Sequence, residues 1–280
     1  MSNLLKRGIT GSILVASIIV MLFLGFRVFT LFTMLLGLGL SAELIGLTQV
    51  DSPQKKIHKT LTKLGFVFLS SSCIGVVGLY IVGAPIDWPL LLLLAVFLSF
   101  FCMHVIFYKG NSLAYLASHF LALAYVTLPL CLSLLLSRHE GGLFRPQNIL
   151  GIFLLLWVFD SSAYGFGSVF GKRTLSPNIS PKKTIEGFGL ALVVTLAIGY
   201  MIPLIFVKAS WSAIDWTIIA AIAGIFGTLG DLFASSIKRG AGAKDSGKLL
   251  PGHGGLLDRF DSYLMTIPWV YLYTQTTALL

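Results

Sequence analysis

The sequence predicts an all-α, polytopic integral membrane protein with about nine transmembrane helices. The mean hydropathy of its 280 residues is +0.90. Only 11% of the residues are charged, whereas a soluble domain carries about 25%. Many apolar runs are also long enough to cross a bilayer core, which takes about 20 residues. These runs are continuous rather than alternating, which favours helices over a β-barrel.

Nine runs have this length. The first follows Lys6 and Arg7 like a signal sequence, but no small-residue cleavage site follows it, so we expect a retained span. Arg27 and Glu43 interrupt or flank the second run, which makes it the weakest prediction. The expected spans are residues 9–26, 29–48, 64–84, 88–107, 113–136, 149–170, 187–207, 213–237 and 263–279.

Basic residues predict the orientation of these spans. With a cytoplasmic N-terminus, sixteen of the 20 lysines and arginines fall in inside segments and four outside, as the positive-inside rule requires. We therefore expect a multi-pass protein of the inner (plasma) membrane with its N-terminus inside and its C-terminus outside. The basic segments then face anionic lipid headgroups and anionic solutes, although the asymmetry alone also fits a pure topology signal.

Polar residues gather late in the chain. We expect residues 1–148 to form about five N-terminal spans, and residues 149–280 to form a catalytic region of about four spans. Two cytoplasmic polar loops belong to the second region, residues 171–188 and 238–262. Each loop mixes bases, acids, glycine and proline, which suits a shaped site better than a solvated tail.

One helix face leads into the second loop. Asp231, Ser235 and Lys238 are spaced i, i+4 and i+7, so they share this face. A carboxylate inside a membrane span is costly and is by default a functional candidate. The alternative for Asp231 is a salt bridge to Lys238 or to a neighbouring span. Three small residues continue the face and allow close helix packing: Gly224, Gly227 and Thr228.

Two further acids open the last span. Asp258 and Asp261 lie three residues apart in the first turns of a helix, where the helix dipole favours negative charge. Capping alone would explain them. Together with Asp231, however, they could hold divalent cations, since Mg²⁺ prefers a few carboxylates with water and substrate phosphates. A pair of such ions can clamp the attacking and leaving oxygens of a phosphoryl displacement.

The segment between these acids suits phosphate. Lys244, Lys248 and several glycines lie there, and glycine lets backbone N–H groups approach phosphate oxygens closely. Gly242, Gly247 and Lys248 match the spacing of a P-loop, but no Ser or Thr follows and the segment follows a membrane helix, so we reject that assignment. For His253 we favour a phosphate or backbone hydrogen bond over metal ligation.

The sixth span and the loop after it add a second polar group. Asp160 and Tyr164 share a helix face, and Asp160 is an acid within an apolar run. Lys182 and Lys183 lie in the following loop, and lysine binds phosphate as a point charge. The two loops could form a cytoplasm-facing pocket reached from the bilayer.

The stretch SSIKRGAGAKDSGKLLPGHGGLLDRFD, residues 235–261, resembles the signature of the phosphatidate cytidylyltransferase (CDP-diacylglycerol synthase) family. The resemblance is clear over about residues 157–271, whereas the first 150 residues match only in hydropathy. We call residues 235–261 the signature stretch. Its matching positions are Ser235, Lys238, Arg239, Lys244, Asp245, Gly247, Pro251, His253, Gly254, Gly255, Asp258, Arg259 and Asp261.

The resemblance implies that CTP and phosphatidate give CDP-diacylglycerol and pyrophosphate, without a covalent enzyme intermediate. It implies CTP, phosphatidate and membrane lipids as partners, no nucleic acid, and leaves a homodimer open. It also implies metal dependence, with Mg²⁺ and K⁺ as candidates for a paired site. Asp231, Asp258 and Asp261 map onto the metal positions, and with Lys238 they form the expected catalytic set. The expected substrate-binding residues are Ser235, Arg239, Lys244, Asp245, Lys248, His253, Arg259, Lys182, Lys183, Asp160 and Tyr164.

Two other classes remain open from the residues alone. A CTP-using lipid kinase would transfer the γ-phosphate to a lipid alcohol and release CDP instead of pyrophosphate. An ion-coupled transporter would use Asp160 and Asp231 as pathway residues, but it should show internal repeats or broken helix pairs, which the sequence lacks.

Overall fold

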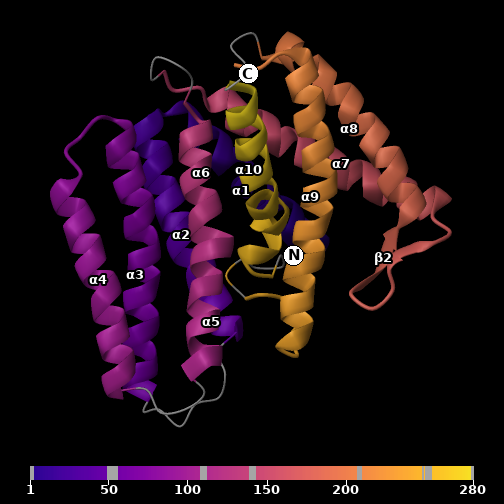
Figure 1. The fold of residues 1–280 in the computed structure, drawn as a ribbon. Helices are drawn as coiled ribbons and strands as arrows, with labels where there is room; N and C mark the ends of the chain where they lie inside the picture. Colours follow the sequence, from indigo (N-terminus) through magenta and orange to yellow (C-terminus); the bar gives the residue numbers. More distant parts are fainter. Residues whose placement is uncertain are drawn as a thin grey trace. The chain divides into compact units, whose positions relative to one another are not determined.

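The fold is known from a computed structural model that describes residues 3–48, 56–107, 112–138, 143–206, 210–247, 249 and 254–278. Lys248 and His253 therefore lie outside the described residues. Over these ranges the chain is almost entirely helical, which confirms the all-α prediction (Figure 1). The helices are α1 (Asn3–Phe23), α2 (Phe26–Thr48), α3 (Lys56–Ile81), α4 (Asp87–Phe107), α5 (Ser112–Ala122), η1 (Leu123–Thr127), α6 (Leu128–Leu136), α7 (Pro146–Phe170), α8 (Ile185–Ile205), α9 (Ala213–Gly240) and α10 (Leu257–Ala278).

The helices agree with the predicted spans. Counting α5, the π-helical turn η1 and α6 as one run, the described residues form nine helical runs, each overlapping one expected span. Six of these runs are long and apolar enough to cross a membrane, and α1 and α4 supply shorter apolar stretches, Gly11–Phe23 and Asp87–Phe100. Helix α2 continues unbroken through Arg27 and Glu43. Helix α10 begins at Leu257, earlier than the expected residue 263.

The chain forms two compact units. Unit 1 comprises Met1–Leu135 and Asp245–Leu257, and unit 2 comprises Leu136–Lys244 and Asp258–Leu280. The division predicted at residue 149 separates the N-terminal spans from the expected catalytic region. The two units are defined by compactness and not by catalysis, so this division stays a prediction.

A chain of buried hydroxyl groups crosses the core of unit 1. The Ser70 hydroxyl on α3 lies 2.8 Å from the Ser41 hydroxyl on α2 and 2.5 Å from the Thr127 hydroxyl in η1. Buried hydroxyls are costly unless they are hydrogen-bonded, so this chain favours one register among the three elements. The π-helical turn places Thr127 where it can join the chain.

Glycines set the close packing of α9 in unit 2. A Cβ atom at Gly224 would lie 2.9 Å from Phe159 on α7, and one at Gly227 would lie 2.8 Å from Leu156 on the same helix. Helices α7, α8 and α9 all contact one another. The expectation that the small residues of α9 allow close packing is thus confirmed for these two glycines.

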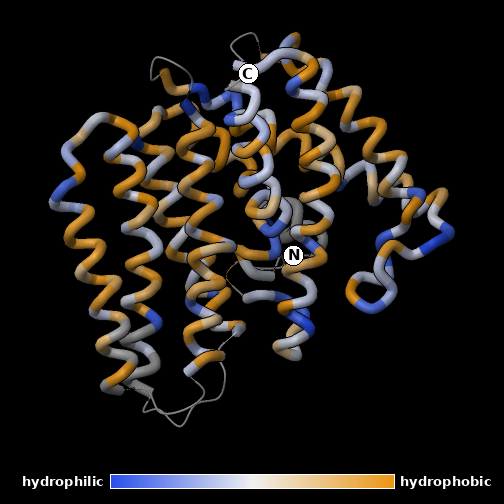
Figure 2. Tube along the Cα trace, in the orientation of Figure 1, coloured by the Kyte–Doolittle hydropathy of each residue, from blue (hydrophilic) through white to orange (hydrophobic). Residues whose placement is uncertain are grey.

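A polar β-hairpin connects α7 and α8, where the sequence suggested only a loop. Strands β1 (Thr174–Ser176) and β2 (Ser180–Thr184) pair antiparallel, and Figure 2 shows that this segment is mostly hydrophilic. Glu186, in the first turn of α8, accepts hydrogen bonds from the backbone N–H groups of Lys172 and Arg173 at 3.0 and 3.1 Å. The Glu186 carboxylate therefore closes the base of the hairpin. The Thr184 hydroxyl caps α8 by accepting from the N–H of Gly187.

Both ends of α9 are defined by local chemistry. Ser212 and Asp215 form a capping box at its N-terminus, and the Tyr273 hydroxyl of α10 donates to Asp215 at 2.7 Å. At the other end Gly242 has a φ of 66°, and the N–H groups of Gly242 and Ala243 bond back to the carbonyls of Arg239 and Lys238. This is a Schellman motif, so Gly242 terminates a helix, consistent with rejecting the P-loop.

Substituting a glycine of α8 tests the packing of α7 against α8. A Cβ atom at Gly187 would lie 2.8 Å from the Ala163 carbonyl oxygen and 2.9 Å from the Cα atom of Gly167, both backbone atoms of α7. We expect Gly187→Ala to destabilise the protein by about 1–3 kcal/mol, measured as a lower thermal unfolding midpoint in detergent. Gly189→Ala is the matched control, because nothing lies within 4 Å of its Cβ position. Equal midpoints for the two variants would contradict this packing.

Candidate active site

Two lysine–aspartate ion pairs join the polar ends of the unit 2 elements. The Lys183 ammonium of β2 lies 2.5 Å from an Asp231 carboxylate oxygen on α9. Lys238 of α9 lies 2.6 Å from Asp258 of α10, and these two side chains are only 10% and 9% exposed. Asp231 thus pairs with a neighbouring element and not with Lys238. Breaking a buried pair by removing one partner costs about 3–5 kcal/mol, so the Lys238–Asp258 pair fixes the local arrangement. The Lys183–Asp231 pair is more open to solvent, with both side chains 30% exposed, and contributes less to stability.

Asp261 lies against α9 because Gly230 has no side chain. A Cβ atom at Gly230 would lie 2.5 Å from the Asp261 carbonyl oxygen. The Asp261 residue is 6% exposed, and its carboxylate accepts the N–H of Ser262 at 2.7 Å. Its charge interacts with those of Asp231, Lys238 and Asp160. The predicted acids of α9 and α10 therefore belong to one electrostatic cluster.

A cavity of about 400 Å³ lies in unit 2 between α7, the hairpin and α8. Four predicted substrate-binding residues line it: Asp160, Tyr164, Lys182 and Lys183. The cavity also has apolar lining, including Phe159, Leu175 and Phe188. Such a mixture of amines and apolar side chains suits a ligand with both an anionic and a hydrocarbon part. The first of the two predicted polar loops thus contributes to a cavity, whereas no described residue of the second loop, 238–262, lines it.

The remaining predicted residues lie more openly. Ser235 is half-buried on α9, between Asp231 and Lys238 in the helix. Arg239 is exposed and donates to the Ala243 carbonyl at 3.2 Å. Arg259 is exposed on α10, and its charge interacts with that of Asp160. Lys244 of unit 2 and Asp245 of unit 1 are both exposed.

The donor set of the cluster suits a hard divalent cation, because Asp231, Asp258 and Asp261 offer carboxylate oxygens. In the part of the chain that the structure describes, no group of three or more His, Cys, Asp or Glu side chains lies close enough to hold a metal ion. Mg²⁺ commonly needs only one or two carboxylates, with substrate phosphates and water completing its coordination. The described residues therefore fit an ion that binds together with substrate better than a permanently caged one.

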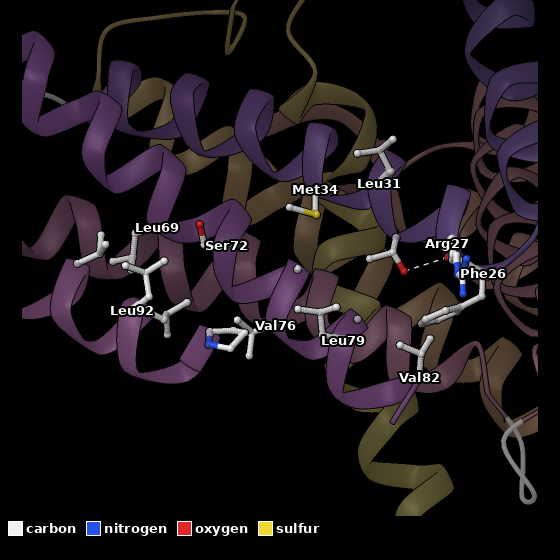
Figure 3. Close-up of a pocket in the computed structure, with 16 residues that line it drawn as sticks. Phe26, Arg27, Leu31, Met34, Leu69, Ser72, Val76, Leu79, Val82 and Leu92 are labelled. Carbon is white, nitrogen blue, oxygen red and sulfur yellow. Dashed lines mark hydrogen bonds between the residues drawn. The ribbon is translucent and has the colours of Figure 1, made fainter. Parts of the chain in front are cut away.

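A larger cavity in unit 1 has a different character. It has a volume of about 570 Å³ and lies between α2, α3 and α4. Figure 3 shows apolar side chains such as Leu69 and Leu92 at one end and Arg27 at the other. Arg27 is the one charged side chain among the described residues that line it. None of the described residues that line this cavity was predicted as a site residue.

One residue of this region was missed by the sequence analysis. Glu43 of α2 accepts hydrogen bonds from the N–H groups of Leu256 and Leu257, both at 2.9 Å, and from the Ser246 hydroxyl at 3.0 Å. All of these residues belong to unit 1. The signal was present, because Glu43 is an acid within an apolar span, but its partners could not be read from the sequence.

Comparison with known proteins finds relatives that share a name. A Staphylococcus saprophyticus protein named phosphatidate cytidylyltransferase is 46% identical to this chain over 132 residues, which cover 47% of this chain and 49% of the relative. The Bacillus subtilis relative of the same name is 38% identical over 152 residues, covering 54% of this chain and 56% of the relative. The matched part thus spans about half the length of these curated relatives.

The family comparison extends further along the chain. The profile described as the Cytidylyltransferase family matches residues 5–277, which includes the N-terminal spans as well as the ion pairs and the signature stretch. The family assignment therefore does not rest on the signature alone, and the chain belongs to the cytidylyltransferase family.

Proposed function

We propose that the protein is a phosphatidate cytidylyltransferase, which converts CTP and phosphatidate to CDP-diacylglycerol and pyrophosphate. The observation that carries this proposal is the pairing of Lys183 with Asp231 and of Lys238 with Asp258. The two pairs bring lysine cations, which suit phosphate, close to carboxylates, which suit a metal ion, and the charge of Asp261 interacts with those of Asp231 and Lys238. The names of the relatives support this choice of nucleotide and lipid.

The proposed reaction is a single displacement at phosphorus. A phosphate oxygen of phosphatidate forms a bond to the α-phosphorus of CTP, while the bond from that phosphorus to the oxygen bridging the β-phosphorus breaks. Pyrophosphate leaves with the bonding electron pair. No general base is needed, since a phosphate monoester is already largely anionic near neutral pH. Catalysis then consists mainly of positioning and charge stabilisation.

The two lysines would exchange partners when substrates bind. Each lysine now neutralises a carboxylate, and each can turn to a phosphate oxygen instead, because lysine carries its charge on a flexible stem. Lys182, Arg239, Lys244 and Arg259 lie exposed on unit 2 and can add positive charge. The proposed substrate-binding set is completed by six further residues: Asp160, Tyr164, Ser235, Asp245, Lys248 and His253.

The carboxylates released by this exchange would hold the metal. We propose Asp231, Asp258 and Asp261 as the metal ligands, with one or two of them holding any one ion; Mg²⁺ is the expected ion and K⁺ the candidate for a second, paired one. When bound, Mg²⁺ would neutralise phosphate oxygens and polarise the attacked phosphorus. The close approach of α10 to α9 at Gly230 holds the backbone of Asp261 against α9, which supports its assignment to the same site as Asp231.

The charge distribution supports a cytoplasmic site. The proposed site residues belong to segments that the positive-inside rule places inside the cell, where CTP is available. We accordingly place the protein in the plasma membrane, with phosphatidate reaching the unit 2 cavity from the bilayer. Membrane lipids are its surroundings, and a homodimer remains a candidate assembly.

A reconstituted assay tests the reaction. Purified protein in detergent or nanodiscs should release pyrophosphate only when CTP, phosphatidate and Mg²⁺ are all present, with an equal amount of CDP-diacylglycerol formed. Chelation by EDTA should stop turnover, and added Mg²⁺ should restore it. Release of CDP would instead indicate a lipid kinase. No nucleotide turnover with any lipid phosphate or alcohol would return the intramembrane acids Asp160 and Asp231 to the transport hypothesis.

Replacing Asp261 tests the metal assignment. We expect Asp261→Asn to lower kcat by about 10³-fold or more, because the amide removes a charged ligand at the reacting centre, while the protein stays folded in detergent. The control is Asp87→Asn, which removes an exposed carboxylate in the first turn of α4. Near wild-type turnover of Asp261→Asn would remove this residue from the metal site.

Replacing Lys183 tests the phosphate assignment. Lys183→Ala should lower kcat/KM for CTP by about 10²-fold, roughly the loss expected for one charge-assisted contact at the reacting phosphates. Lys172→Ala is the matched control, since the Lys172 side chain is exposed in the same connection and does not line the cavity. If both variants had the same kcat/KM, the hairpin would have no part in binding the nucleotide.

A further inference from the structure

Glu43 is a carboxylate with an unusual set of partners. One oxygen, Oε1, accepts the N–H of Leu256, and the other, Oε2, accepts the N–H of Leu257 and the Ser246 hydroxyl. Glu43 lies more than 200 positions away from all three in the sequence. Hydrogen bonds to an ionised group are about twice as strong as neutral ones. These contacts therefore hold α2 to two parts of the signature stretch, Ser246 and the pair Leu256 and Leu257.

Helix α10 depends on this carboxylate for its start. The first N–H groups of a helix have no partner within the helix, and a nearby Ser, Thr, Asp or Asn usually supplies one. The residues that lead into α10 are Gly254, Gly255, Leu256 and Leu257, and none of their side chains has an acceptor. Glu43 supplies the missing acceptors from α2. Its charge also complements the positive end of the helix dipole.

Two glycines of the signature stretch make room for Glu43. A Cβ atom at Gly247 would lie 2.5 Å from its Oε1 atom. A Cβ atom at Gly255 would lie 2.5 Å from its Oε2 atom and would also collide with the Ser246 hydroxyl. Any larger residue at these two positions would displace the carboxylate. The sequence analysis assigned the glycines of this loop to phosphate, whereas these two lie against a carboxylate of the protein itself.

We propose that Glu43 is a positioning residue that fixes the first turn of α10, and with it the proposed metal ligands Asp258 and Asp261. This inference rests on the proposed function, because it assigns those two acids to the reaction. Glu43 holds the N–H of Leu257, the residue directly before Asp258, so it sets where the helix begins. Loss of this contact would let the first turn fray and misplace both acids.

Two readouts test the proposal, one of which does not require activity. In Glu43→Gln, an NH₂ group replaces one of the two acceptor oxygens, so at least one of the three bonds is lost. We expect faster amide hydrogen–deuterium exchange in a peptide covering residues 254–264, with no change in peptides from α9. We also expect kcat to fall about tenfold or more with the KM for CTP nearly unchanged, since small misplacements of reacting groups have effects of this size.

Matched variants separate positioning from general damage. Asp87→Asn removes an exposed carboxylate in the same unit and should leave both the exchange pattern and kcat unchanged. Ser246→Ala removes only the hydroxyl donor to Glu43, so it should show the same two changes in milder form. It replaces Glu43→Gln as the deciding variant if the latter does not fold.

The outcomes are distinct. Unchanged exchange at residues 254–264 in Glu43→Gln would overturn the proposal, as would faster exchange with wild-type kcat. An inactive wild-type protein would refute the proposed function, and the exchange experiment would then decide by itself whether Glu43 holds the start of α10.

Discussion

Polar partners for the acids of the apolar helices hold the elements of each unit together. Unpaired ions are costly in an apolar interior, yet α2, α9 and α10 all carry carboxylates. Asp258 is matched by Lys238 on a different helix, and Glu43 is matched by backbone N–H groups and a hydroxyl. Because each partner comes from a distant part of the sequence, these contacts also determine which elements lie together. The polar cluster and the fold of each unit therefore depend on the same interactions.

Glycine serves several physical purposes in the same stretch of chain. Gly242 adopts a positive φ and ends α9, Gly230 lets α10 approach α9, and Gly247 and Gly255 leave space for a carboxylate. A glycine-rich polar loop next to lysines suggests phosphate binding, but the contacts of its glycines Gly242, Gly247 and Gly255 are explained without phosphate. A glycine-rich pattern shows that a small residue or a positive φ is needed at each position. It does not by itself identify the group that lies against each glycine.

Much of the fold could be predicted from the sequence, because hydropathy and span length are local properties. The nine expected spans overlap the nine helical runs of the described residues. Intramembrane acids such as Asp231 could be singled out because an acidic residue within an apolar run is visible in the sequence before its partner is known. The partners themselves could not, since Lys183 reaches Asp231 through a hairpin whose strands are only three and five residues long. The role of Glu43 was not predicted for a related reason. Two of its partners are backbone N–H groups, which every residue except proline has, so no pattern of side chains indicates them.

Helices α9 and α10 are fastened to each other at both ends and touch at Gly230 between them. Lys238 and Asp258 join one end, while Tyr273 and Asp215 join the other. These two helices can neither slide nor separate without breaking a polar contact. Apart from Thr228 of α9, the described lining of the neighbouring cavity comes from α7, α8 and the hairpin, where Tyr164 and Lys182 are exposed. A change in the width of this cavity would therefore cost least if α7, α8 and the hairpin moved, because a shift of α9 would disturb its contacts with α10.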